Sequence, residues 1–285
     1  MSTHSLSLKQ DFERDGFVLV KNFFSPDRIK NVLSWIEDQD LSDTASTWTE
    51  KEPGVSLAVW PWVNRQDSPL ADLVKDSSVL DFASSLIEKE VYLWASKVNF
   101  KAPWCGTVEY YHQDLVYWRD RGYDSGDMLS CMTFLDPHKL ENGALHVIPG
   151  SHKKGLIEHQ MFSNINGLAK MMVPPDTLAE LADELSLVHI DAEPGDALFF
   201  HSLLIHGSAH NISSGSRRIA LTQINSATNK PEGVQTKAKE FNLKRAQFEL
   251  REAKRRYEWF QKKYDDQYAS DEILFSAPIP DEEKD

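Results

Sequence analysis

An alternating pattern of polar and apolar residues over residues 97–103 predicts a β-strand near the middle of the chain. Successive side chains of a strand point to opposite faces, so Lys97, Asn99 and Lys101 are expected on one face. These polar side chains could belong to a binding site or could simply be exposed to solvent.

Two further stretches also favour strands. Residues 197–200 are continuously apolar and follow a Pro-Gly turn at residues 193–196, which predicts a buried strand. Residues 110–118 are rich in Tyr, Val and Trp, which favour extended backbone, so this segment is also expected to be a strand. The middle of the chain is therefore predicted to be mainly β.

The C-terminal part shows a different, helical period. Its apolar positions follow one another in alternating steps of three and four: Leu243, Ala246, Leu250, Ala253, Tyr257, Phe260 and Tyr264. This spacing predicts one seam of an amphipathic helix about three heptads long. The main interpretation is a supporting helix packed on the outer sheet. A dimer seam, or a lid whose many Lys and Arg residues bind an anionic substrate, is the alternative.

Composition limits the class of protein and its partners. With 285 residues, of which 41% are hydrophobic, the chain can bury one full core. We expect that core over residues 1–228 and a helical extension packed on the same domain over residues 229–285, joined by a turn at residues 228–233. A net charge of −13 argues against nucleic acid and anionic membranes as partners.

Several features favour the cytoplasm. The two cysteines, Cys105 and Cys131, form no disulfide framework, as is usual in a reducing compartment. The sequence shows no apolar run long enough to span a membrane, no secretory leader and no peroxisomal ending. We expect a cytoplasmic protein that acts as a monomer or homodimer on a small molecule.

Candidate chemistry lies in two distant segments. His112 and Asp114 stand two residues apart and would share one face of a strand. Together with His206 from a second strand, they can occupy one triangular face of an octahedral metal site and leave three positions open. This set of two His and one carboxylate is typical of non-haem Fe(II) oxygenases. The chain has ten His, so the order of the motifs, with Arg217 eleven residues after His206, carries the specificity.

The other histidines are weaker candidates. His210 stands four residues after His206, but a zinc pair at this spacing needs a helix, and Gly207 and Ser208 argue against one. His146 and His152 lie in a turn-rich segment and are interpreted as structural. A zinc hydrolase or a non-catalytic binding protein remains an alternative, although neither needs Arg217.

These motifs resemble the phytanoyl-CoA dioxygenase family, which includes ectoine hydroxylases. The resemblance extends from about residue 12 to about residue 224. It rests also on Phe-Glu-Arg-Asp-Gly-Phe-Val-Leu-Val at residues 12–20, Asn-Gly-Ala-Leu at 142–145 and Ile-Pro-Gly-Ser-His-Lys at 148–153. It implies a mainly β protein built on a double-stranded β-helix (a cupin-like jelly roll) with flanking α-helices, to which the long C-terminal helix is added. Fe(II), 2-oxoglutarate and O2 are the implied cofactors.

The resemblance also implies roles for single residues. His112, Asp114 and His206 match the iron ligands, and Arg217 matches the arginine that binds the far carboxylate of 2-oxoglutarate, a task suited to its planar fork of donors. Other candidates for that site are Ser208, Lys101 and Asn99. Arg218 is expected on the opposite face, in a structural role.

The implied reaction is hydroxylation of an unactivated C–H bond with release of succinate and CO2. Asp114 stands where related halogenases carry Ala or Gly, which favours hydroxylation. Desaturation, oxidative cyclisation and hydroxylation of an acyl-CoA are alternatives. An amino acid, a derivative of one or a secondary metabolite is the favoured substrate. Ala95 replaces a Gln of the ectoine hydroxylases, which argues against ectoine itself.

Two features bear on the substrate pocket. Aromatic side chains could form its wall or belong to the core: Trp60, Trp62, Trp104 and Trp118. Residues 47–66 are predicted to form an irregular loop that could cover the active site.

Overall fold

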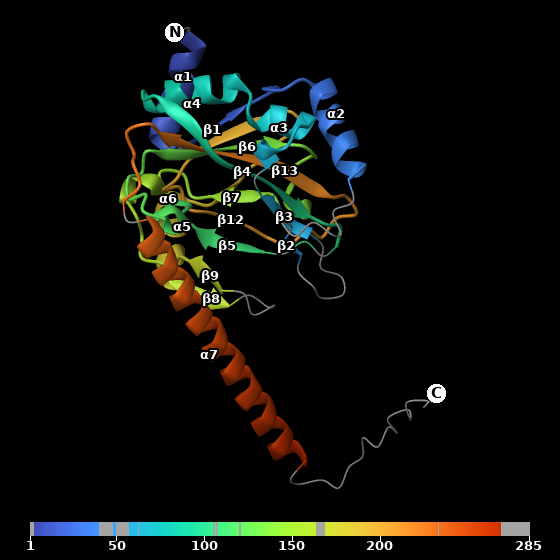
Figure 1. The fold of residues 1–285 in the computed structure, drawn as a ribbon, viewed down its shortest axis with the longest axis vertical. Helices are drawn as coiled ribbons and strands as arrows, with labels where there is room; N and C mark the ends of the chain where they lie inside the picture. Colours follow the sequence, from blue (N-terminus) through green and yellow to red (C-terminus); the bar gives the residue numbers. More distant parts are fainter. Residues whose placement is uncertain are drawn as a thin grey trace.

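Two antiparallel sheets pack against each other in the centre of the molecule, and helices cover the outer face of the larger sheet (Figure 1). The computed structural model describes residues 3–39, 48–49, 57–61, 63–104, 106, 108–119, 121–163, 169–232 and 234–268. Within these ranges the predicted mainly β architecture is confirmed.

The strands of the larger sheet lie in the order β1 (Phe17–Val20), β11 (Ala197–His201), β6 (Met128–Phe134), β13 (Arg217–Ser226), β4 (Val91–Lys101), β3 (Leu57–Pro61) and β2 (Trp48–Thr49). Those of the smaller sheet lie in the order β10 (Val188–His189), β7 (Leu145–Val147), β12 (His206–Ser208) and β5 (Glu109–His112). A separate hairpin joins β8 (Gln160–Ser163) to β9 (Ala169–Met172).

The α-helices are α1 (Thr3–Asp15), α2 (Pro26–Glu37), α3 (Pro69–Val74), α4 (Ser77–Ile87), α5 (Leu115–Arg119), α6 (Pro175–Leu185) and α7 (Val234–Tyr268). Short 3-10 turns form η1 (Val63–Arg65), η2 (Leu140–Asn142) and η3 (Ser151–Lys154). None of the helices in the described ranges combines the length and apolar character needed to cross a bilayer.

The larger sheet is buried on both faces. Its outer face packs on the first four helices through a cluster that includes Ile29, Leu73 and Phe199. Its inner face packs on the smaller sheet through side chains such as Phe134 and Val147. This double burial explains why residues 197–200 are continuously apolar rather than alternating.

The turn before β11 has a clear local cause. Gly195 has φ +93, a conformation that favours glycine, and a Cβ there would meet the Phe24 carbonyl oxygen at 2.4 Å. The Asp196 carboxylate accepts hydrogen bonds from the backbone N–H groups of Asn22 (2.8 Å) and Glu193 (2.9 Å). The turn therefore starts β11 and also holds the end of β1 beside it.

Two sequence-based predictions about segments need correction. The strand expected over residues 110–118 ends at His112, and residues 115–119 form α5. Residues 57–61, expected in an irregular loop, form β3, which pairs with β4. The β-favouring residues of α5 pack into a local cluster around Leu115, Trp118 and Tyr123, so tertiary packing overrides their local preference.

The predicted C-terminal helix is present and is longer than the seam, since α7 runs from Val234 to Tyr268. It packs against β8 and β9 and then extends away from the body of the protein (Figure 1).

A substitution at Phe199 tests how much the outer core contributes to stability. Its buried ring lies 4.7 Å from the ring of Phe82 and 5.5 Å from that of Phe23, measured between centroids. We expect Phe199→Ala to lower the free energy of unfolding by about 3–5 kcal/mol, because it leaves a cavity between the sheet and the helices. Denaturant unfolding would measure this loss. Leu187→Ala, at a position 45% exposed, should change stability by about 0.5 kcal/mol or less.

Candidate metal centre

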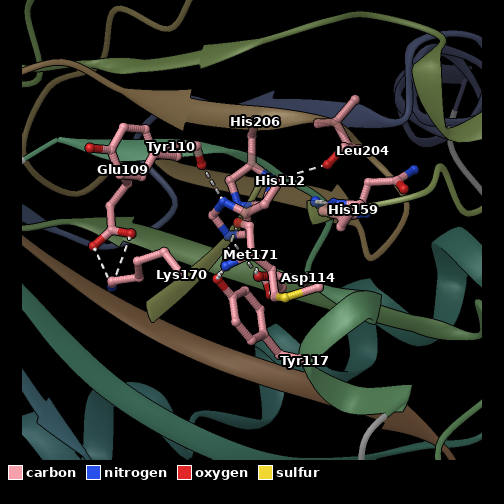
Figure 2. Close-up of polar contacts among 12 residues, drawn as sticks. Glu109, Tyr110, His112, Asp114, Tyr117, His159, Lys170, Met171, Leu204 and His206 are labelled. Carbon is pink, nitrogen blue, oxygen red and sulfur yellow. Dashed lines mark hydrogen bonds and ion pairs between the residues drawn. The ribbon is translucent and has the colours of Figure 1, made fainter. Parts of the chain in front are cut away.

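Three predicted ligands meet where the edge strand β5 of the smaller sheet pairs with β12 (Figure 2). His112 ends β5, His206 begins β12, and the two are direct partners across the strands. Asp114 follows two residues after His112. One ligand atom from each of the three lies within 4.8 Å of the others, a spacing at which they could hold one metal ion.

Asp114 reaches the site by a turn and not by the alternation of a strand. Gln113 is fully buried, and its side-chain amide donates to the carbonyl oxygens of Gly155 (2.8 Å) and Leu203 (2.7 Å). Its Oε1 accepts from the backbone N–H of Ile157 at 2.8 Å. These bonds fix the backbone between the two ligands, and the strand ends there.

Backbone carbonyls orient both histidines. His112 donates from Nδ1 to the carbonyl oxygen of Tyr110 at 2.7 Å, and His206 donates from Nδ1 to that of Leu204 at 2.9 Å. A carbonyl only accepts, so each Nδ1 carries the proton and each Nε2 keeps a free lone pair for a metal.

A hydrogen bond also orients the Asp114 carboxylate. Ser130 on β6 donates to Asp114 Oδ2 at 2.9 Å. The other oxygen, Oδ1, lies 3.7 Å from His112 Nε2 and 3.8 Å from His206 Nε2. Burial would raise the pKa of Asp114, but the two histidines lower it below its usual range, so the group is ionised. The three free donor atoms therefore suit a divalent cation.

A buried cationic cluster lies beside the triad. Arg217 on β13 is the cross-strand partner of Lys101 on β4, and both are almost fully buried. Lys101 donates from Nζ to Ser208 Oγ at 2.8 Å and to the carbonyl oxygen of Ala209. Arg217 Nε and Asn99 Oδ1 are buried and have no hydrogen-bond partner among the residues that the structure describes.

Among the described residues, no carboxylate lies within ion-pair distance of Lys101 or Arg217, although Glu109 acts on both from farther away. Burial, together with the neighbouring Arg217, lowers the pKa of Lys101 to about 6. Burial also lowers the pKa of Arg217 to about 10, although Glu109 and Asp136 oppose that effect. Uncompensated buried cations are costly, and a bound dicarboxylate would supply the missing charge and acceptors. The residues present thus fit 2-oxoglutarate.

The neighbouring arginine has a structural role. Arg218 binds the Asp136 carboxylate through Nε and a terminal guanidinium nitrogen, both at 2.8 Å, and also lies 3.1 Å from Glu37. Among the described residues, Arg217 has no carboxylate bonded in this way, so the two adjacent arginines differ in their partners.

The competing residues lie outside the triad. Tyr111 and His146 share a hydrogen bond of 2.8 Å, and His210 donates from Nδ1 to the Gly106 carbonyl oxygen at 3.0 Å. Trp60 stacks on Trp35 in the outer core. Of the two roles expected for Trp60, pocket wall or core, the structure therefore shows the core.

The other tryptophans differ among themselves. Trp118 belongs to a buried cluster near α5, whereas Trp104 is exposed. Trp62 and Cys105 lie outside the described residues.

Other residues near the triad were not predicted from the sequence. Ser130 orients Asp114, and Tyr117 packs edge-on against the His112 imidazole with 5.5 Å between ring centroids. Glu109 and Lys170 lie beside the histidines (Figure 2). No sequence pattern identifies Ser130, because its role depends on strand β6 lying next to Asp114 in the folded protein.

Comparison with known proteins gives a consistent picture. Residues 12–219 match the family model for phytanoyl-CoA dioxygenase (PhyH). The ectoine dioxygenase of Sphingopyxis alaskensis is 29% identical over 79% of this chain and 78% of its own length. The L-proline trans-4-hydroxylase of Streptomyces griseoviridis is 26% identical over 81% of this chain and 90% of its own.

The fold has a solved counterpart. The crystal structure of EctD from S. alaskensis with 2-oxoglutarate and 5-hydroxyectoine matches with a TM-score of 0.68 at 28% identity, covering 83% of this chain and 81% of that one. The expected cupin-like fold is thereby confirmed.

The hydrogen bond from Ser130 to Asp114 provides a test of the centre. Ser130→Ala should weaken Fe(II) binding by about 10- to 100-fold, because the carboxylate loses the bond that orients Oδ1. Anaerobic metal titration would measure the change. Ser202→Ala removes an equally buried hydroxyl that donates to the Gly126 carbonyl, and it should leave metal affinity unchanged.

Proposed function

The chain belongs to the phytanoyl-CoA dioxygenase family, and we propose that His112, Asp114 and His206 are its iron ligands. The protein is a non-haem Fe(II)- and 2-oxoglutarate-dependent dioxygenase. It hydroxylates an unactivated C–H bond of a small molecule and releases succinate and CO2.

One observation carries the residue assignment. Three free donor atoms, from His112, Asp114 and His206, converge within 4.8 Å beside a buried arginine that has an unpaired Nε. A structural cluster of two histidines and a carboxylate has no need of an uncompensated buried cation nearby. A site that binds a metal and a dicarboxylate needs both the three donor atoms and the buried cation.

The residues around the metal have distinct tasks. Fe(II), with 2-oxoglutarate and O2, supplies the oxidising chemistry when bound. Arg217 binds the far carboxylate of 2-oxoglutarate through its planar fork, and Ser208, Lys101 and Asn99 complete that site. Ser130 and the two backbone carbonyls keep the ligands in the geometry that the metal requires.

Further assignments complete the proposal. The catalytic core comprises residues 1–228, and residues 229–285 form a helical extension of the same domain. The protein acts in the cytoplasm, as a monomer or homodimer, on an amino acid, a derivative of one or a secondary metabolite. The ectoine and proline enzymes among its relatives support a small substrate of this kind.

Anaerobic titration of the metal-free protein with Fe(II) and then 2-oxoglutarate tests the site. We expect the weak visible charge-transfer band of the complex in the wild type and its loss in His112→Ala. Arg217→Ala should weaken 2-oxoglutarate binding by about 2–5 kcal/mol, roughly 30- to 4,000-fold, because it removes a buried partner of the carboxylate.

Arg14→Ala, which changes an exposed arginine on α1, is the matched control and should bind 2-oxoglutarate normally. Iron binding without any band in the wild type would contradict the cosubstrate assignment. An unchanged 2-oxoglutarate affinity in Arg217→Ala would contradict the role of Arg217.

Lys101 links cosubstrate binding to pH. Its pKa is about 6 in the folded protein and 10.5 ordinarily, so between these values the unfolded chain binds a proton that the folded protein has released. The free energy of unfolding without cosubstrate should therefore rise with pH in this window, by up to about 1.4 kcal/mol per pH unit from this residue.

Lys101→Met should remove that slope and also weaken 2-oxoglutarate binding. Denaturant unfolding of both proteins at pH 6.5 and pH 9 would measure the difference. Equal slopes in the wild type and the variant would show that Lys101 keeps its proton when buried.

A further inference from the structure

A β-bulge turns Glu109 toward the metal centre. In β5 and β12, His112 is opposite His206 and Glu109 is opposite Ser208, with a register shift between the two pairs. Two steps along β12 thus correspond to three along β5. In a regular strand Glu109 would point away from His112, and the extra residue places both on one face.

The two strands lie unusually close at this bulge. A Cβ on Gly207, between His206 and Ser208, would lie 3.0 Å from the Glu109 carbonyl oxygen and 3.0 Å from the Tyr111 ring. Glycine therefore permits the approach that the bulge requires. Bulges beside active sites commonly redirect a side chain, so the position of Glu109 is a feature of the site.

Glu109 is paired with a cation from another element. Lys170 Nζ on β9 lies 3.5 Å and 3.4 Å from the two carboxylate oxygens, and the two side chains are about one third exposed (Figure 2). The segment after β9 is tied to β5 by a hydrogen bond of 2.9 Å from the Val173 N–H to the Tyr111 carbonyl oxygen. The pair therefore links the hairpin to β5, the strand that carries His112.

The charges around Glu109 keep its carboxylate ionised. Burial would raise the pKa of Glu109, but Lys170, His112, Lys97 and Lys101 lower it to about 2. A partly exposed ion pair contributes only about 0–1 kcal/mol to stability. Stability alone gives little reason to bend a strand so that a carboxylate shares a face with His112.

Resting on the function proposed above, we propose that Glu109 and Lys170 recognise a small zwitterionic substrate. The Glu109 carboxylate binds the cationic amino group and the Lys170 ammonium binds the carboxylate of the same molecule. A zwitterion that inserts between them gives each residue a new partner of the right sign. An acyl-CoA would leave Glu109 without one.

A substrate panel tests this assignment. The twenty common L-amino acids, ectoine and glycine betaine would be assayed for stimulated succinate release, beside a long-chain acyl-CoA. We expect at least one zwitterion to be active and its methyl ester to be much poorer. Glu109→Gln and Lys170→Gln should each raise its KM by about 10- to 150-fold, as expected for the loss of a hydrogen bond to a charged group.

The double variant Glu109→Lys/Lys170→Glu separates recognition from structure. It restores an ion pair with the charges exchanged, so a merely structural pair would recover normal KM, whereas a recognition pair would not. Lys153→Gln, at an exposed lysine on η3, is the control.

The visible band of the Fe(II) and 2-oxoglutarate complex should persist in all Glu109 and Lys170 variants. Its absence from the wild type would instead refute the proposed function. A panel in which no zwitterion is active, or full recovery by the double variant, would overturn the recognition proposal.

A separate observation concerns α7. Its seam is exposed at each position whose side chain is described, and Leu250 has 74% of its surface in solvent. Leu243, Leu250 and Tyr257 recur at seven-residue intervals, with Ala246 and Ala253 between them. An apolar heptad seam on a helix that extends from the body is the pattern of a coiled-coil strand.

We infer that a second copy of this chain covers the seam. With Leu243, Leu250 and Tyr257 at the first heptad position, Glu249 and Lys254 flank the seam in consecutive heptads. In a parallel pair Glu249 faces Lys254 of the partner subunit, and the same contact occurs twice by symmetry. These two flanking charges are therefore complementary between two parallel copies, and within one copy Glu249 also pairs with Arg245 and Lys254 with Glu258.

Sedimentation velocity of the full-length protein tests the dimer. We expect a species of twice 32.5 kDa for the wild type and for Lys262→Asp, on the outward face of α7, but a monomer for Leu250→Asp. Circular dichroism would show that Leu250→Asp remains folded. A monomeric wild type, or a Leu250→Asp variant that still dimerises, would overturn this inference.

Discussion

The site depends on the antiparallel pairing of β5 with β12. This register sets His206 opposite His112 and, through the bulge, Ser208 opposite Glu109. The larger sheet supplies the remaining parts, since Ser130 comes from β6 and Arg217 from β13. The proposed iron ligands and the proposed cosubstrate residues therefore keep their relative positions only while the two sheets stay packed. The apolar layer between the sheets positions the site as well as stabilising the fold.

The polar part of this interior, which we propose binds the cosubstrate, costs stability in the absence of a ligand. Lys101 and Arg217 are buried next to each other without a bonded carboxylate, and Arg217 Nε and Asn99 Oδ1 have no partner. Arg218, one residue on, shows the ordinary alternative, with Asp136 bound at two points. This contrast between adjacent arginines supports the proposed role of Arg217 in binding the cosubstrate, while Arg218 has a structural role.

Sequence-based prediction succeeded where a pattern reports local geometry. The alternation around Lys101 and the apolar run at residues 197–200 correspond to β4 and β11. The order of His112, Asp114, His206 and Arg217 indicated the chemistry, because few functions need those residue types together. Prediction failed beyond His112, where residues favouring a strand form α5 around a buried Trp118. It also missed β3, whose pairing with β4 is a contact between distant segments.

The sequence by itself determined the family, the cofactor chemistry and the ligand types, because these follow from residue identities and their order. Tertiary structure decided how those residues meet. Gln113 ends the strand between two ligands, Ser130 orients the carboxylate from another sheet, and a bulge turns Glu109 toward the metal centre. Each of these depends on which backbone lies alongside, and strand register is set by long-range pairing that no local pattern of residues records.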